Sequence, residues 1–172
     1  MDSDITGAGD RWIPEEKYEF IRASVPIVCV DVLLSPYDAP GQIGLIQRAT
    51  YNGGFGWCLI GGAVLHNEPL PDAVDRHVQT TLSGNIRVIR STMHLGAVIE
   101  YFSEPGLGDF YDPRKHAVAL TYTAGCDFNG SLEATGEAMD FHWYSIDNLS
   151  RIDFGFGQGE AVARALKSDG RL

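Results

Sequence analysis

The pattern of apolar and polar positions predicts a series of strands with one helix in the middle of the chain. Residues 25–34 form an unbroken run rich in β-branched side chains, which is typical of a strand buried on both faces. Val74, Val78 and Leu82 recur at every fourth position, so residues 71–82 are predicted to form a helix with these side chains in the core. Shorter apolar segments predict further strands at 43–49, 57–60, 94–102, 116–124 and 141–145.

Two more helices are expected near the ends of the chain. Residues 14–23 begin with a proline followed by two glutamates, which suit the first turn of a helix. Residues 158–167 place four apolar side chains on one face: Ala161, Val162, Ala165 and Leu166. The predicted fold class is α/β, a mixed sheet with helices packed against it in an α/β/α sandwich. We expect an N-terminal helical extension over 1–24, a central domain over 25–150, and a C-terminal helix over 151–172 packed on the same domain.

Composition excludes several classes of partner. The 172 residues suit one domain, and 13 basic against 23 acidic side chains give a formal net charge of −10. Affinity for nucleic acid comes from lysine and arginine, so we expect no nucleic-acid partner. No apolar run approaches the ~20 residues of a membrane span. A small phosphorylated ligand remains compatible with this charge, because a local site can be positive in an acidic protein.

Cysteine usage and the N-terminus bear on the compartment. Cys29, Cys58 and Cys126 each lie in or beside an apolar run, which predicts reduced, buried thiols rather than a disulfide or zinc framework. The acidic, polar N-terminus is unlike a signal peptide. We therefore expect a cytoplasmic protein.

One stretch, WCLIGGAVLHNEPLPDAVDR at residues 57–76, has the spacing of a known motif. Gly62 is followed after five residues by Glu68, and Glu68 after seven residues by Arg76. This is the first half of the Nudix box, in which glutamates follow the arginine. The chain has His77, and then a Thr80–Thr81 pair, where the second half of the box has those glutamates.

Over residues 25–150 the chain resembles the Nudix superfamily, and within it the GDP-mannose mannosyl hydrolases. The shared features are an arginine nine residues before a tryptophan (Arg48 and Trp57), the Trp-x-Leu-x-Gly-Gly turn, and a late aromatic strand after an acidic loop. The chain also resembles uncharacterised Nudix-like proteins of actinobacteria. The resemblance implies the sandwich fold, a nucleoside diphosphate linked to another group as substrate, and a homodimer; Mg²⁺ or Mn²⁺ is expected as a cofactor only if the metal site is relocated.

The resemblance also assigns roles to residues. It implies a structural ion pair between Glu68 and Arg76, and a structural role for Trp57 in packing the turn. Arg48 matches a substrate-side residue of the family. If the domain binds an anion, the residues expected to contact it are Arg48, Gly61, Gly62, His77, Thr80 and Thr81. Positions 77, 80 and 81 share one helix face, where glutamates would hold Mg²⁺. Because histidine and threonine supply no fixed negative charge there, the standard box predicts no metal site.

Three functions stay open at this point. The first is a non-catalytic or weakly active domain that binds a nucleotide, a nucleotide-sugar or another small anion. The second is a hydrolase with a relocated site, in which Glu137, Asp140 and the Gly61 carbonyl hold Mg²⁺ or Mn²⁺ and supply catalysis. The third is a structural or interaction domain with an empty cleft. A charged loop, Asp112 to Lys115, is interpreted as solvent-exposed, with the mouth of a cleft as the alternative.

Overall fold

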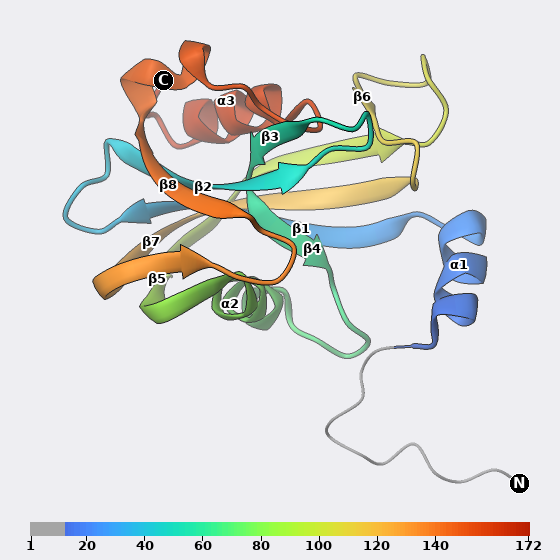
Figure 1. Cartoon of the computed structure of the whole chain (residues 1–172), viewed down its shortest axis with the longest axis horizontal. Helices are drawn as coiled ribbons and strands as arrows, with labels where there is room; N and C mark the ends of the chain where they lie inside the picture. Colours follow the sequence, from blue (N-terminus) through green and yellow to red (C-terminus); the bar gives the residue numbers. More distant parts are fainter. Residues whose placement is uncertain (1–12) are drawn as a thin grey trace, which may run out of the picture.

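The computed structural model describes residues 13–172, in which eight strands form one mixed sheet with a helix on each face (Figure 1). The hydrogen-bonded order is β3-β2-β1-β7-β5-β6, while β4 pairs with β1 and β8 pairs with β2. The strands are β1 (Ile27–Pro36), β2 (Gln42–Ala49), β3 (Phe55–Cys58), β4 (Ile60–Ala63), β5 (Leu82–Phe102), β6 (Phe110–Tyr111), β7 (Ala117–Ala134) and β8 (Asp140–Ser145). The helices are α1 (Glu15–Ser24), α2 (Leu70–Thr81) and α3 (Gln158–Ser168), with a 3-10 helix, η1 (Ile146–Arg151).

Strand β1 is the centre of the sheet, as its apolar run predicts. It runs parallel to β7 along its whole length and antiparallel to β4 and β2. Apart from Val28, every residue of β1 is buried. One of these buried residues is an acid, Asp31, which pairs in register with Gly61 on one side and Thr121 on the other.

The helices α2 and α3 cover opposite faces of the sheet, so the predicted α/β/α sandwich is confirmed (Figure 1). On α2 and at its end, Val74, Val78 and Leu82 are at most 2% exposed, as their spacing predicts. On α3, the four predicted apolar residues are fully buried. Val162 and Leu166 pack there in one cluster with Leu33 of β1. This burial supplies most of the stabilisation that a short helix lacks in isolation.

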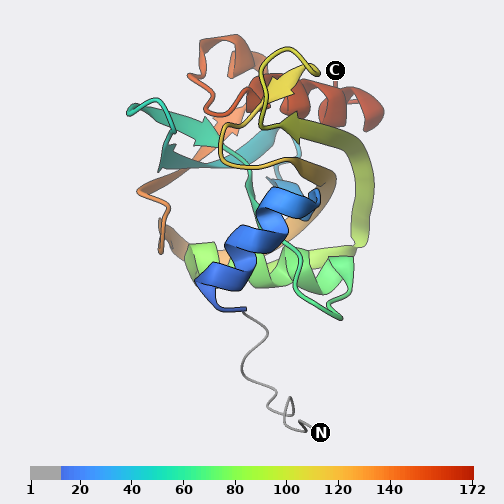
Figure 2. The ribbon, with the colours of Figure 1, turned by 90° about the vertical axis from the view of Figure 1, so that its right-hand side faces the viewer.

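Helix α1 lies at one end of the sheet, in front of it in Figure 2. It begins after Pro14, as predicted, and Tyr18 packs against the core cluster around Ile27 and Ile99. None of its residues is buried, and Phe20 is 74% exposed. The first 12 residues of the predicted N-terminal extension lie outside the described residues.

Two strands are longer than their apolar patterns predict. The expected strands at 94–102 and 116–124 are parts of β5 and β7, which pair antiparallel from Tyr101↔Ala117 to Leu82↔Ala134. The additional halves are polar and contain glycines, and bulges interrupt the register. The alternation of apolar and polar residues is lost there, because each bulge moves the following side chains to the other face of the sheet.

The predicted strand at 57–60 is divided between β3 and β4. The chain pairs with β2 up to Cys58 and with β1 from Ile60 onwards, so Leu59 is the point of exchange between two partners. The sequence did not predict β6 or η1, which are short and lack a periodic pattern. All three cysteines are buried free thiols, as expected. No helix within residues 13–172 is both long enough and apolar enough to cross a bilayer.

Candidate functional site

The loop before α2 is fixed by the ion pair that the motif predicts. Arg76 Nε donates to Glu68 Oε1 at 2.7 Å and its Nη2 donates to Glu68 Oε2 at 2.8 Å. The Leu65 backbone N–H donates to the same carboxylate at 2.9 Å. The hydrogen bonds from Arg76 lower the pKa of Glu68 to about 2, although its burial opposes this. The pair therefore ties the loop to the helix as a charged, bidentate contact.

His77 packs against the glycine turn rather than facing an open cleft. Its Nε2 donates to the Ala63 carbonyl at 3.1 Å, and Arg76 Nη2 donates to that carbonyl as well, at 2.9 Å. A Cβ at Gly62 would lie 2.6 Å from the His77 ring, so a larger residue at this position would have to displace the ring. Burial lowers the pKa of His77, which keeps the ring neutral at pH 7.

The backbone carbonyls of the two threonines at the end of α2 are bonded to Thr135, while the Thr80 hydroxyl bonds within the helix. The Thr80 hydroxyl donates to the Arg76 carbonyl at 2.8 Å, within the same helix. The Thr135 hydroxyl donates to the Thr80 carbonyl at 2.9 Å, and the Thr135 N–H to the Thr81 carbonyl at 2.8 Å. These bonds fix the end of α2 to the segment before β8.

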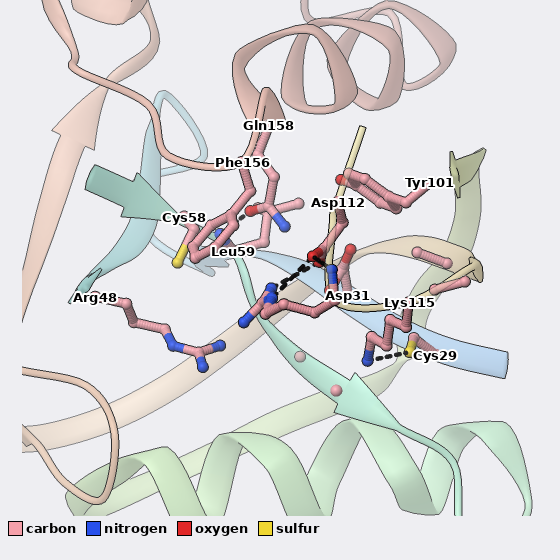
Figure 3. A pocket seen from close by; sticks show the side chains of 15 residues that line it. Cys29, Asp31, Arg48, Cys58, Leu59, Tyr101, Asp112, Lys115, Phe156 and Gln158 are labelled. Atoms are coloured by element: carbon pink, nitrogen blue, oxygen red, sulfur yellow. Dashed lines mark hydrogen bonds and ion pairs between the residues drawn. The ribbon is translucent and has the colours of Figure 1, made fainter. Parts of the chain in front are cut away.

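A pocket of about 90 Å³ opens on the α3 side of the sheet, between β1, β4, β7 and the segment that follows β6 (Figure 3). Of the predicted ligand residues, Arg48, Gly61 and Gly62 line it. His77 and the two threonines of α2 do not line it, so their contact with a ligand stays a prediction. The pocket, not the inner edge of α2, is the place where charged side chains converge.

Asp31 and Gly61 meet on one wall of this pocket. A Cβ at Gly61 would lie 2.2 Å from Asp31 Oδ1 and 2.3 Å from the Val30 carbonyl, so only glycine allows β4 to approach β1 here. Burial raises the pKa of Asp31 to about 7, against the attraction of the Lys115 and Arg48 charges. No group within residues 13–172 donates a hydrogen bond to the Asp31 carboxylate that would lower its pKa. Asp31 is therefore a buried acid that is only partly ionised at neutral pH.

The opposite wall comes from the charged loop after β6. Arg114 holds Asp112 through two side-chain hydrogen bonds, of 2.8 Å and 2.7 Å. Burial opposes ionisation of Asp112, but these bonds outweigh it and hold its pKa below the usual value. Lys115 Nζ donates to Cys29 Sγ at 3.6 Å. The interpretation of this loop as solvent-exposed is wrong for Asp112, which is only 5% exposed; the alternative, a cleft mouth, is what the structure contains.

An aromatic ring lies between the arginines of the pocket. The guanidinium carbon of Arg114 is 4.8 Å from the centre of the Phe156 ring, and that of Arg48 is 6.0 Å away. Phe156 has φ of 58°, a left-handed conformation that is rare for a bulky residue and costs roughly 1–3 kcal/mol. The turn before α3 thus holds a strained backbone that places this ring at the pocket.

The acidic candidates of the relocated site lie outside the pocket lining. Glu137 is exposed and forms an ion pair with Arg48. Asp140 Oδ1 accepts the backbone N–H of Phe141 at 2.8 Å. Trp57 packs edge-on against Tyr144, with 5.0 Å between the ring centroids.

Most of the residues that line the pocket are not predicted from the sequence. A visible signal existed for Asp31, a single acid within an apolar, β-branched run. Tyr101 and Gln158 carried no such signal, because β5 and α3 bring them to the pocket from distant parts of the chain. In the part of the chain that the structure describes, no group of three or more His, Cys, Asp or Glu side chains is arranged to hold a metal ion.

Comparisons with known proteins agree with this architecture. Residues 8–171 match the family described as "Domain of unknown function (DUF4916)". No curated protein matches the chain significantly in sequence. A structure from Jonesia denitrificans, described as a possible asymmetric diadenosine tetraphosphate (Ap4A) hydrolase, is 31% identical with a TM-score of 0.72. The match covers 87% of this chain and 98% of that one.

Two more distant structures share the fold. The Nudix domain of NrtR from Shewanella oneidensis, solved with ADP-ribose, is 18% identical with a TM-score of 0.64, over 90% of this chain and 98% of that one. A MutT Nudix hydrolase from Burkholderia pseudomallei is 24% identical with a TM-score of 0.60, and the match covers 84% of this chain and 98% of that one. The chain is therefore a member of the DUF4916 family and has the fold of the Nudix superfamily.

Proposed function

We propose that this protein binds a small phosphorylated compound, of the nucleoside-diphosphate type, in the pocket beside β1 and β4. We further propose that it has lost most or all of the metal-dependent hydrolysis of its superfamily. The charge of the pocket is the observation that carries the proposal. Its lining has three cationic side chains, Arg48, Arg114 and Lys115, against two acids, Asp31 and Asp112, in a protein with a net charge of −10.

The geometry of the cations suits a phosphate at the mouth of the pocket. Arg114 is held in place by Asp112 and by the Phe156 ring, so its guanidinium is pre-organised. Within residues 13–172, Arg48 forms its ion pair with the exposed Glu137, and a phosphate would compete well for it. Because Asp31 is partly neutral at pH 7, the excess of positive charge at the pocket exceeds one at that pH.

The donor set on α2 does not fit a magnesium ion. Mg²⁺ prefers carboxylates and water in octahedral geometry, and the three box positions offer an imidazole and two hydroxyls. His77 Nε2 is occupied by the Ala63 carbonyl, and the Thr80 hydroxyl by the carbonyl of the preceding turn. These contacts support a degenerate box, and we derive no reaction step through a metal at this place.

The relatives support a nucleotide derivative as ligand. The names of the similar structures include diadenosine tetraphosphate and ADP-ribose, both of which contain phosphates joined to a ribose. The NrtR domain was solved with its ligand bound, which shows that this fold is used for binding. We propose that the present chain retains this capacity through its own pocket residues.

Two alternatives are outcomes of the same experiment. A hydrolase with a relocated site would use Glu137 and Asp140, but both carboxylates already have partners, and neither lines the pocket. A purely structural domain would leave the pocket without a ligand. Neither alternative explains the charge of the pocket.

The test is a titration of the full chain with ADP, ADP-ribose, GDP-mannose and pyrophosphate, each with Mg²⁺ and with EDTA. We expect binding without metal and no release of phosphate or sugar. Ligand at about 100 times its dissociation constant would add roughly 2.7 kcal/mol, or a rise in Tm of about 5–11 °C. Metal-dependent turnover would favour the hydrolase, and no Tm shift with any anion would favour the structural domain.

Matched arginine variants locate the site. Arg48→Gln removes a cation from the pocket, while Arg87→Gln removes a more exposed arginine that also pairs with a carboxylate, Asp127, elsewhere on the sheet. We expect Arg48→Gln to weaken binding about 10-fold or more, since hydrogen bonds to charged groups contribute about 1.5–3 kcal/mol. Equal effects of the two variants would refute a phosphate contact at Arg48.

A further inference from the structure

The inner end of the pocket is lined by polar side chains that the cationic mouth does not explain. Asp31, Tyr101 and Gln158 are 7%, 7% and 8% exposed, and all three line the pocket. They come from β1, β5 and the first residue of α3. Figure 3 shows the Tyr101 hydroxyl pointing into the pocket, on the side where Gln158 and Asp112 lie.

These groups have unused hydrogen-bonding capacity. The Tyr101 hydroxyl is buried, and the Gln158 side chain is close enough to lower its pKa but not to complete a hydrogen bond with it; no other group within residues 13–172 does so. Gln158 Oε1 accepts the Leu59 N–H at 2.7 Å, which leaves the two N–H donors of its amide for the nearby Tyr101 hydroxyl or for a ligand. Asp31 has no hydrogen bond that stabilises its carboxylate among the described residues. Buried polar groups in proteins are normally paired, so the unpartnered Tyr101 hydroxyl beside Asp31 and Gln158 points to a ligand.

The chemistry of the three groups selects a hydroxyl-bearing partner. A hydroxyl can donate to Asp31 and accept from Tyr101 or from the Gln158 amide. A phosphate would meet the Asp31 carboxylate at close range, and like charges repel. The phosphate therefore belongs at the mouth, beside Arg48 and Arg114, and an uncharged polar group belongs inside.

The size of the pocket narrows the class further. Its volume is about 90 Å³. A buried cavity of about 150 Å³ accommodates one benzene ring. A nucleobase and a whole sugar ring are both larger than benzene, so neither fits entirely within the inner end in this conformation. Only the polar edge of a ligand enters, with the rest towards the mouth, and the hydroxyl edge of a sugar provides both donors and acceptors there.

We propose that Asp31, Tyr101 and Gln158 recognise the hydroxyl groups of a sugar whose phosphate is held by the cations at the mouth. The ligand class is a sugar phosphate or a nucleoside diphosphate linked to a sugar, with the sugar innermost. This inference rests on the proposed function, and it adds the orientation of the ligand and the residues that choose it.

The test uses small probes that separate the two parts of the ligand. Dissociation constants of the full chain are measured for pyrophosphate, ribose 5-phosphate, mannose 1-phosphate and GDP-mannose, by calorimetry in EDTA. We expect Tyr101→Phe and Asp31→Asn each to weaken binding of at least one sugar-containing probe 10-fold or more. We expect both variants to bind pyrophosphate within about twofold of the unmodified protein. Tyr144→Phe is the matched control, because Tyr144 packs on Trp57 outside the pocket. This variant should change neither the affinity for the sugar-containing probes nor the affinity for pyrophosphate.

The outcomes distinguish this inference from the function on which it rests. Tyr101→Phe removes only an unpaired hydroxyl, so the variant should fold, and loss of sugar affinity then reports on recognition. If the unmodified protein binds pyrophosphate, but both variants bind the sugar-containing probes as tightly as the unmodified protein does, the inference is wrong and the proposed function still stands. Failure of every probe to bind the unmodified protein would overturn the proposed function as well.

Discussion

Replacing Asp31 by Asn should stabilise the protein, and increasingly so as the pH rises. Burial raises the pKa of this carboxyl from 3.8 to about 7, so the folded state holds its proton over a pH range in which the unfolded state has lost it. The contribution of Asp31 to stability is therefore fully present below pH 3.8 and is lost as the pH rises through about 7. Asparagine has a similar shape and no charge, so the variant does not carry this penalty.

The magnitude follows from the two pKa values. At about 1.4 kcal/mol for each pH unit between them, ionisation of Asp31 costs up to about 4 kcal/mol at pH 8. At pH 5 the penalty is smaller, because the carboxyl is still protonated in the folded state and only the distance of the pH from 3.8 counts. The difference in the free energy of unfolding between Asp31→Asn and the unmodified protein should therefore widen by about 2–3 kcal/mol between pH 5 and pH 8.

Urea unfolding at pH 5 and at pH 8 measures this difference directly. Other groups titrate in both proteins, so their contributions cancel when the variant is compared with the unmodified chain at each pH. A difference that is the same at both pH values, or a variant that is less stable at pH 8, would refute the view that Asp31 is an uncompensated buried acid. A buried acid that destabilises the fold is typical of a functional residue.

Three further predictions concern the motif and its loop. Glu68→Gln should destabilise the protein by about 3 kcal/mol at pH 7, and the unmodified chain should lose this stability as the pH falls from about 4.5 to about 2, both measured by urea unfolding. Gly61→Ala should lower Tm strongly in a thermal melt because its Cβ has no room, whereas Gly41→Ala, with nothing within 4 Å, should change it little. Thr81→Glu should raise the affinity for Mn²⁺ in a calorimetric titration if α2 still faces a cleft wide enough for an ion; unchanged affinity would show that it does not.

Local patterns predicted the elements whose burial is regular. The β-branched run of β1 and the spacing of Val74 and Val78 on α2 reflect burial on fixed faces, and both predictions are confirmed. The far halves of β5 and β7 could not be predicted in this way. Their bulged, glycine-containing ladder depends on pairing between residues far apart in the chain, from Ile89 with Gly125 to Leu82 with Ala134.

The candidate site was less predictable than the fold for a similar reason. Motif spacing predicted the Glu68–Arg76 pair, because both residues lie in one short segment. The pocket combines residues as distant as Asp31 and Gln158, and only the register of β1 with its neighbours and the packing of α3 bring them together. An acid in an apolar run signals that a polar site is near, but it does not identify the other members.

A crystal structure of the protein grown with GDP-mannose and Mg²⁺ would test the central claim most directly. The account predicts the diphosphate beside Arg48 and Arg114, with the mannose hydroxyls within hydrogen-bonding distance of Tyr101. An ordered magnesium ion on the His77 and Thr81 face of α2, with the diphosphate bound to it, would contradict the account.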